Sequence, residues 1–311
     1  MSEANALRSK NALLFFFIKP CYNYLVMKII LSRKGTDSAS GGIPGIFIRE
    51  EKKIVSFPIP LPDDIRYSDL SYDGKTYAEI IKELDSTFQY DNCHLDPDLL
   101  SDVKRRGKWQ AAFGQEGAPA KHLDNQGVKE GDIFLFFGWF REAIKEKDGQ
   151  YKFRTDEPDL HMIYGYLQVG KILREQREMQ DELPDHPHSK YDADDPKHRN
   201  NRIYVAKEHL FDDTTYPGAG VFPFSDDLIL TKGKEPRSHW KKFLPKNEYD
   251  VTYHNNRNKE CAYFPSALRG QEFVITSHSN ESDPKKKELT EKQSKKIKQW
   301  IIKRIKNEDN G

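Results

Sequence analysis

The stretch Ile133-Phe134-Leu135-Phe136-Phe137-Gly138-Trp139-Phe140 decides the fold of this chain. It is apolar at every position and lacks the alternation of a strand that has one face in water. Unbroken apolar strands occur in sheets that are covered on both faces. The stretch therefore predicts a buried strand at the centre of a mixed sheet, with Arg141 at its end.

Shorter signals surround this central strand. Strand-type segments lie at 28–32, 46–48, 54–59, 151–154, 161–169, 203–206, 228–231 and 273–276. Helices are predicted at 76–88 and 290–305, which begin with the capping boxes Thr76/Glu79 and Thr290/Gln293, and at 171–179. Because strands and helices do not alternate strictly, we expect a single compact α+β domain around a mixed β-sheet with peripheral helices.

Composition divides the 311 residues into three parts. Residues 1–26 contain a short apolar run, Leu13–Ile18, which is followed by no small-residue cleavage site and is far too short to span a bilayer. We expect this leader to be a non-native extension before Met27, or disordered; a docking segment is the alternative. Residues 27–280 are expected to form the domain, and residues 281–311 a basic linker and an amphipathic helix.

The formal net charge of +1 hides a basic tail. Between Lys285 and Lys306, ten Lys and Arg residues stand against two Glu residues, a local charge of +8 (10 − 2). Such a tail attracts polyanions, although a solvated helix that keeps the protein soluble has the same pattern. Three scattered cysteines, Cys21, Cys93 and Cys261, exclude a disulfide framework and a cysteine-rich zinc module. They fit a reducing cytoplasm, and with no apolar stretch long enough for a membrane span we expect a cytoplasmic protein.

The turn after the first strand, Ser32-Arg33-Lys34-Gly35-Thr36-Asp37-Ser38, is the first candidate site. A loop at a strand end leaves backbone donors free, and two cations beside them favour a bound phosphate. We expect Ser32, Arg33, Lys34 and Ser38 to bind a phosphate or nucleotide and Asp37 to be an acid, a base or a metal ligand. The alternative is an ordinary surface turn in which Asp37 pairs with Lys34.

Two later segments combine groups that catalysis uses. His94-Leu95-Asp96 places an imidazole and a carboxylate on one side of an extended segment, as a metal site or a base with its orienting partner requires. The glycine-containing loop 114–124 offers Gln115, which has the donor and acceptor to read a base edge, and His122. We expect His94, Asp96 and His122 to be catalytic and Gln115 to bind the nucleotide; chance pairing is the alternative for the His-x-Asp motif.

The end of the central strand carries a ring and a guanidinium. Trp139 has the shape to stack on a base, and Arg141 has the charge to neutralise a phosphate. His161 opens a neighbouring strand and is a third catalytic candidate beside them. A core position for Trp139, which is slightly favoured, and a surface ion pair for Arg141 are the alternatives.

Residues 181–200 are acidic and contain three prolines and three histidines. Asp185-His186-Pro187-His188 has the composition of a metal-binding loop. A metal site needs rigid support, and this segment has the character of an exposed, mobile loop. His186 and His188 are therefore weak candidates for metal ligands, and a solvated loop is the favoured interpretation.

An ordered set of short blocks resembles the nucleotide modification associated domain 3 family of bacteria and phages. Each block is weak alone, and together they span about residues 27–276. They lie at 28–38 with 41–44, 56–60, 66–70, 94–98, 113–118 with 122–123, 131–141, 165–170, 186–188, 201–206, 218–222 and 270–274. The chain departs from the family pattern at Thr36, where an aromatic residue is common, and in its lysine-rich tail.

The resemblance implies an α+β domain that acts in making or handling modified DNA bases, and it strengthens the candidates named above other than Ser38, including His186 and His188. We expect an enzyme of DNA or nucleotide base hypermodification, or of modified-base processing, with DNA or a nucleotide as partner. The reaction, the cofactor and the oligomeric state are not specified by the sequence. The alternatives are a non-catalytic reader of modified DNA and a defence nuclease or glycosylase. Convergence of His94, Asp96, His122 and His161 favours an enzyme.

Overall fold

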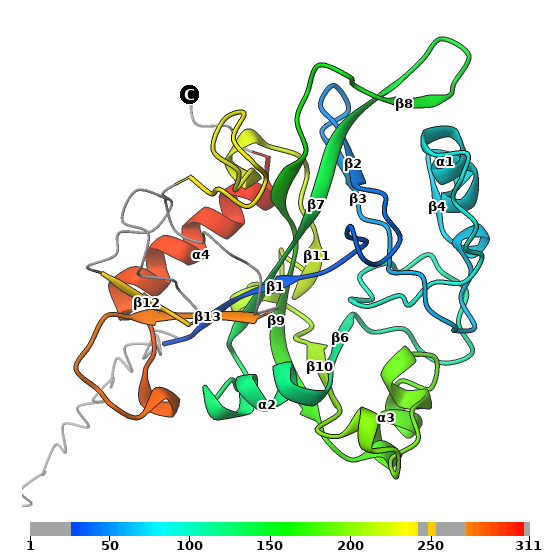
Figure 1. Ribbon diagram of the computed structural model, residues 1–311. Helices are drawn as coiled ribbons and strands as arrows, with labels where there is room; N and C mark the ends of the chain where they lie inside the picture. Colours follow the sequence, from blue (N-terminus) through cyan, green and yellow to red (C-terminus); the bar gives the residue numbers. More distant parts are fainter. Residues whose placement is uncertain (1–25, 242–247, 253–271, 308–311) are drawn as a thin grey trace, which may run out of the picture.

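The computed structural model describes residues 26–241, 248–252 and 272–307 (Figure 1). Within these residues eleven strands form one mixed sheet, whose main path runs β12-β13-β1-β7-β9-β10-β6. The strands of this path are β1 (Ile29–Arg33), β6 (Ala112–Gln115), β7 (Ile133–Lys145), β9 (Leu160–Leu173), β10 (Arg202–Ala206), β12 (Tyr249–Val251) and β13 (Glu272–Ser277).

The remaining strands attach beside this path or pair separately, and the helices lie around the sheet. The attached strands are β2 (Gly45–Ile48), β3 (Lys53–Val55), β8 (Tyr151–Phe153) and β11 (Ala219–Val221), and the separate pair is β4 (Ser71–Tyr72) with β5 (Lys75–Thr76). The α-helices of the described residues are α1 (Tyr77–Leu84), α2 (Gly117–Asn125), α3 (Gln176–Glu182) and α4 (Glu291–Ile305). The chain is thus a compact α+β domain on a mixed sheet, as the sequence predicts.

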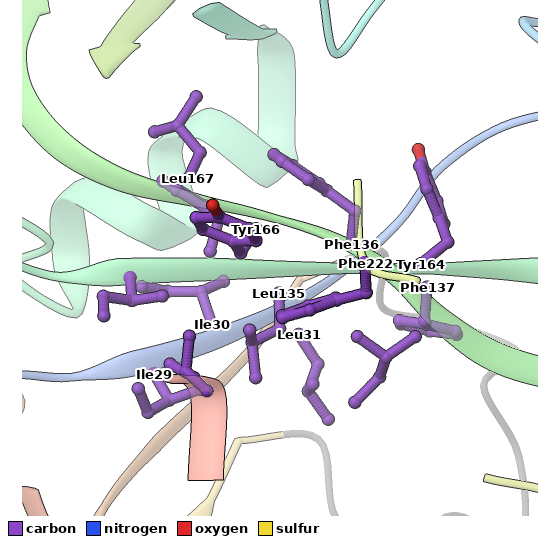
Figure 2. Close-up of a cluster of buried hydrophobic side chains, with 14 of the residues drawn as sticks. Ile29, Ile30, Leu31, Leu135, Phe136, Phe137, Tyr164, Tyr166, Leu167 and Phe222 are labelled. Carbon is purple, nitrogen blue, oxygen red and sulfur yellow. The ribbon is translucent and has the colours of Figure 1, made fainter. Parts of the chain in front are cut away.

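β7 is the centre of the sheet. It runs parallel to β1, with Arg33 opposite Phe137, and antiparallel to β9. Residues 133–137 and Phe140 of β7 belong to one buried cluster with β1 and β9, and Figure 2 shows Leu135 and Phe137 inside this cluster. The predicted central strand is confirmed, but it does not end at Arg141. It continues to Lys145 because its far half pairs with β2 and β8.

A second apolar cluster lies under the β2–β3 hairpin and α1. The predicted strands at 46–48 and 54–59 pair as this hairpin, the second only as far as Val55, and the predicted capping box of Thr76 with Glu79 is present. Helix α1 buries Ile80 in this cluster but ends at Leu84, one turn earlier than predicted. Phe88 is buried in the same cluster from the loop that follows the helix.

Three segments differ from the sequence prediction. Residues 171–173 continue β9 because they pair with β10, so α3 begins only at Gln176. Residues 228–231 form no strand: a 3-10 helix ends at Leu228, and Ile229 makes a single bridge. Residues 117–125, predicted as a loop, form α2. Long-range pairing, which a local pattern does not reveal, decides the first two.

Residues 186–189 are buried, contrary to the exposed loop that composition predicts for residues 181–200, whereas most of residues 190–200 are exposed as predicted. A 3-10 helix, η2 (Pro187–Lys190), buries His188 and Ser189. Ser189 Oγ donates to the backbone oxygen of Met179 in α3 at 3.0 Å, and the His188 ring lies against Gly114 of β6. For residues 186–189 the prediction was wrong because packing onto β6 and α3 supplies partners for their polar groups.

Helix α4 packs on the same core as the sheet. The predicted capping box of Thr290 with Gln293 is present, Ile301 is fully buried, and Trp300 packs on the core cluster. Figure 1 shows α4 at the left of the view near β12 and β13. No helix among the described residues is long and apolar enough to cross a membrane. The predicted leader, apart from Val26, lies outside the described residues, as do Cys21 and Cys261.

Candidate functional site

A cavity of about 190 Å³ opens where β1 and β6 end. Its wall is built from the turn after β1, the end of β6, the segment around residues 94–96 and the 3-10 helix η2. Seven of the residues singled out from the sequence line this polar cavity: Arg33, Lys34, Asp37, His94, Asp96, Gln115 and His188. Segments that are far apart in the chain therefore bring their reactive groups to one place.

Lys34 lies in the polar cavity between two buried carboxylates. Its Nζ is 3.8 Å from Asp96 Oδ2 and 3.9 Å from Glu272 Oε1. Glu272 enters from β13, and its Oε1 accepts hydrogen bonds from Ser32 Oγ at 3.1 Å and from Gln115 Nε2 at 2.6 Å. Burial raises the pKa of Glu272, and the nearby ammonium of Lys34 opposes this effect. One ammonium is thus shared by two carboxylates.

Asp96 divides its two carboxylate oxygens between different neighbours. Oδ1 accepts from the backbone N–H of Gly114 at 2.6 Å and lies 3.6 Å from His186 Nε2. Oδ2 faces Lys34 and lies 4.0 Å from His188 Nε2. Burial acts to raise the pKa of Asp96, but His186, Lys34 and His188 outweigh it and hold the pKa well below its usual value. Asp96 is therefore an anion at neutral pH.

His188 is fixed in one orientation by Asn201 and Gly114. Its Nδ1 is 2.6 Å from Asn201 Oδ1, and Nδ2 of the same amide donates to the backbone oxygen of His188 at 2.8 Å. A Cβ on Gly114 would overlap the imidazole and come within 2.6 Å of its Nε2. Burial lowers the pKa of His188 to about 3, so the ring is neutral.

His94 completes the cluster. Its Nδ1 lies 3.9 Å from Asp63 Oδ2, and Lys190 Nζ pairs with the other oxygen of Asp63 at 2.6 Å. Burial lowers the pKa of His94. One nitrogen or oxygen from each of His94, Asp96 and His188 lies within 4.8 Å of the other two. Two imidazoles and a carboxylate at this spacing are a set that can hold a metal ion.

The turn after β1 is shaped by Gly35 and Asp37. Gly35 has φ +83, a conformation in which an L side chain is strained. Asp37 Oδ1 accepts from the backbone N–H groups of residues 39 and 40, each at 2.8 Å, and its Oδ2 lies 3.9 Å from Arg33 Nη2. Asp37 therefore closes the turn and faces Arg33, whereas Lys34 points to Asp96.

Two histidines that were expected to be catalytic do not line the polar cavity. His122 Nε2 lies 3.2 Å from Thr252 Oγ1. His161 is buried, and its Nδ1 accepts a hydrogen bond from Trp240 Nε1 at 3.0 Å. Convergence of His94, Asp96, His122 and His161 was expected to favour an enzyme. Only His94 and Asp96 lie together at the polar cavity, and His122 and His161 lie elsewhere.

The other three expected residues contact neighbouring side chains: Trp139 and Ser38 contact Arg237, and Arg141 contacts Asp159. The guanidinium of Arg237 covers the Trp139 ring at 4.3 Å and donates to Ser38 Oγ. Arg141 Nε donates to Asp159 Oδ1 at 2.6 Å. None of these three expected residues is among the residues that line the polar cavity.

Sequence reasoning missed Glu272, Asp63 and Asn201, which contact the expected residues. Glu272 opens an otherwise apolar strand, and a lone carboxylate at such a position is a signal that could have been used, because an unpaired buried charge is costly. Asp63 and Asn201 stand in polar segments, where their residue types are common and give no signal.

A second cavity, of about 270 Å³, shares Gly35 and Asp96 with the polar cavity. Its wall is mainly apolar and includes Pro97, Tyr77 and Tyr164. A charged chamber and an apolar chamber therefore meet at Asp96. Such a pair suits a ligand that has one ionic and one ring-shaped part.

A family model described as nucleotide modification associated domain 3 matches residues 28–276. The match covers all the residues of the cluster, from Ser32 on β1 to Glu272 on β13. The description of the family associates it with nucleotide modification. No curated protein and no solved structure matches the chain.

Proposed function

Because the chain belongs to the nucleotide modification associated domain 3 family, we propose that it is an enzyme that modifies a base of DNA or of a nucleotide, or that processes such a modified base. The polar cavity is its active site in this proposal. The observation that carries the proposal is the meeting of Lys34, His94, Asp96 and His188 at the wall of one cavity.

The chemistry of this group supports a catalytic role. Burying ionisable side chains costs stability, and clusters with shifted pKa values occur mainly where a protein acts on something. Here a neutral imidazole, that of His188, and an ammonium, that of Lys34, both lie within 4.0 Å of the anionic Asp96. The set supplies a proton acceptor and a positive charge that stabilises a developing anion.

The two cavities favour a nucleotide as substrate. Arg33 and Lys34 line the polar cavity and offer the charges that bind a phosphate. Tyr77 and Tyr164 line the second cavity and offer apolar walls for a base. A nucleotide unit, free or within DNA, has both parts, and DNA of bacteria or phages in the cytoplasm is the proposed source.

A reader of modified DNA is the competing function. Reading an extruded base requires an accessible aromatic platform. Trp139 was the best candidate for this platform, but Arg237 covers its ring and it lines neither cavity. Tyr77 and Tyr164 offer a base contact to a reader as well, but a reader does not need the ionisable groups that meet at the polar cavity. The enzyme is therefore the better-supported function, and a defence nuclease or glycosylase is an outcome that the experiment distinguishes.

The test is mass spectrometry of nucleosides. DNA and free nucleotides are taken from bacterial cells, with and without phage infection, that make the wild-type chain, the Asp96→Asn variant or no protein. We expect the wild type to change the amount of at least one nucleoside. Asp96→Asn keeps the shape of the side chain but removes the anion, so the change should fall about 100-fold or more.

A matched control is His122→Gln, which alters a histidine outside the polar cavity and should leave the nucleoside change intact. Asp37→Ala tests the turn separately: full activity would leave Asp37 with the structural role of closing it. A folded wild-type protein that alters no nucleoside but binds modified DNA would contradict the proposal and establish the reader. Strand breaks or abasic sites would establish the nuclease or glycosylase.

A further inference from the structure

The side chains of His94, Asp96 and His188 face one another without a hydrogen bond between any two of them in the described part of the chain. His188 Nε2 lies 4.0 Å from Asp96 Oδ2. Ligands about 2.1 Å from one tetrahedral metal ion lie roughly 3.4 Å apart, so small side-chain movements bring the three atoms into range. The spacing is too long for hydrogen bonds and suits a shared ion.

The tautomer of His188 shows that its Nε2 has a lone pair to offer. Nδ2 of Asn201 donates to the backbone oxygen of His188 and to Gln176 Oε1, which fixes the orientation of the amide. The amide oxygen of Asn201 therefore accepts from Nδ1–H of His188. A neutral ring protonated at Nδ1 has a bare Nε2, and this nitrogen faces the anionic Oδ2 of Asp96. Two lone pairs that face each other in a buried place call for a cation.

His186 has the opposite tautomer and supports Asp96 from behind. Its Nδ1 accepts from the backbone N–H of His188 at 3.3 Å, so Nε2 carries the proton and points at Asp96 Oδ1, 3.6 Å away. This Nε2 has no hydrogen-bond partner within normal reach although it is buried. With Gly114 N–H on the same oxygen, Oδ1 is engaged, whereas Oδ2 has, among the described residues, only the ammonium of Lys34 at 3.8 Å as a donor and can take a ligand role.

The outer neighbours have the arrangement that metal sites use. Metal-binding histidines commonly place their second nitrogen against a carboxylate or an amide oxygen, which fixes the ring. His188 has Asn201 in this role, and His94 has Asp63 at 3.9 Å, whose Oδ2 is buried without a hydrogen-bond partner. The structure thus supplies both the first ligands and their supports.

We propose that His94, Asp96 and His188 bind one divalent transition-metal ion at the wall of the polar cavity. Two imidazole nitrogens and one carboxylate oxygen suit Zn²⁺, Fe²⁺ or Co²⁺, whereas Mg²⁺ and Ca²⁺ prefer oxygen ligands only. Three protein ligands leave a position open toward the cavity, which is the pattern of a catalytic metal. Metal binding needs no substrate, so it is tested apart from the proposed function; with the ion bound, His188 Nε2 is a ligand and no longer the proton acceptor.

The experiment uses the full, untagged chain after dialysis against a chelator. Co²⁺ is titrated while its visible absorption is recorded, and Zn²⁺ is then added in competition. We expect one Co²⁺ per chain, with the strong absorption of four- or five-fold coordination, and its displacement by one Zn²⁺. His188→Gln should weaken Co²⁺ binding about 100-fold or more, while the matched control His122→Gln should bind as the wild type does.

X-ray absorption of the zinc-loaded wild type keeps the proposal testable if His188→Gln fails to fold. The expected spectrum shows two imidazole ligands and only nitrogen or oxygen neighbours. Binding of less than one ion per chain, coordination by six oxygens, a sulfur ligand, or a folded His188→Gln variant with unchanged affinity would each overturn the proposal.

Discussion

The regions around His161 and His188 contain two imidazoles that look alike by burial and charge but differ in what they contact. The side chains are about equally buried, with His161 6% and His188 4% exposed. Burial lowers the pKa of each to about 3, and each uses Nδ1 for a hydrogen bond. Neither burial nor the pKa therefore separates a structural histidine from a functional one.

The difference lies in the charged groups that surround each ring. His161 accepts from the indole of Trp240, and its ring packs edge-on against Phe137 and Trp240. The charged groups that act on it, Arg237 and Arg33, are cations that repel a proton. His188 instead presents Nε2 to the carboxylate of Asp96 at the wall of a cavity. A buried histidine is a functional candidate when the lone pair of its remaining nitrogen faces another lone pair, because both then need a cation.

Gly114→Ala should displace the His188 ring, and it should have a larger effect on the site than substitutions at His161 or on α4. The new Cβ would overlap the His188 ring, so the imidazole must leave its place beside Asp96. We expect Co²⁺ affinity and the nucleoside change to fall 10-fold or more, as when a supporting group is removed from a metal site. Overpacking should also lower the free energy of unfolding by about 1–3 kcal/mol.

Gly220→Ala is the matched control, because it adds the same methyl group to a strand of the same sheet. The three atoms nearest to its Cβ would all belong to the Tyr166 side chain, the closest at 3.3 Å. Metal titration of both variants, with thermal unfolding alongside, compares them directly. Equal metal affinities in Gly114→Ala and the wild type would show that the position of His188 does not matter for the site.

The parts of the fold that the sequence predicted are those specified by neighbouring residues. The apolar stretch of β7 and the two capping boxes are local signals, and the structure confirms each. The errors include the lengths of β7 and β9, the absence of a strand at 228–231, and helix α2 and the buried residues 186–189 where loops were predicted. Pairing with partners far along the chain decides these features, and spacing alone does not show such partners.

The candidate site was also predictable only where its residues are close together in the sequence. His94 and Asp96 stand two residues apart, so a local argument places them together. His188 was ranked low because a polar, proline-containing segment usually lies in water, whereas here it packs on Gly114. Glu272 was missed because its partner Ser32 is 240 residues away in the chain. Only the three-dimensional packing joins these groups.

His161→Asn should change the pH dependence of the free energy of unfolding and so show what the buried His161 contributes to stability. The folded pKa of about 3 lies below the unfolded value of 6.5, so between these values the unfolded chain binds more protons. The wild type therefore loses stability as the pH falls through this window, at up to roughly 1.4 kcal/mol per pH unit. The asparagine oxygen can still accept from Trp240 but does not titrate. We expect the variant to lose roughly 2 kcal/mol less than the wild type between about pH 6 and about pH 4.5.

The measurement is urea unfolding of both proteins across this pH range. Asp132, whose pKa burial raises to about 6, changes stability in the opposite direction, and His188 changes it in the same direction as His161. Both groups are present in wild type and variant, so the difference between the two proteins isolates His161. Parallel pH profiles would mean that His161 is protonated equally in the folded and unfolded chains.

Buried and exposed lysines can be compared in the same way as the two histidines, and the exposed lysines of α4 give the smallest expected effect. Lys34 is mostly buried between Asp96 and Glu272, whereas Lys292, Lys295 and Lys296 on α4 are exposed. Exposed lysines bind DNA through phosphates, without sequence preference, and each neutralised phosphate releases counterions.

Changing these three α4 lysines to glutamine should therefore reduce the slope of log affinity against log salt by roughly 0.9 for each phosphate that is no longer neutralised. The nucleoside change at saturating DNA should stay as in the wild type, because α4 does not line the polar cavity. The same substitutions at the exposed Lys82, Lys104 and Lys108 are the control and should leave the slope nearly unchanged. Fluorescence titrations of duplex DNA at several salt concentrations measure both slopes. If the two triple variants give the same slope as the wild type, the basic face of α4 has only the role of a solvated helix surface.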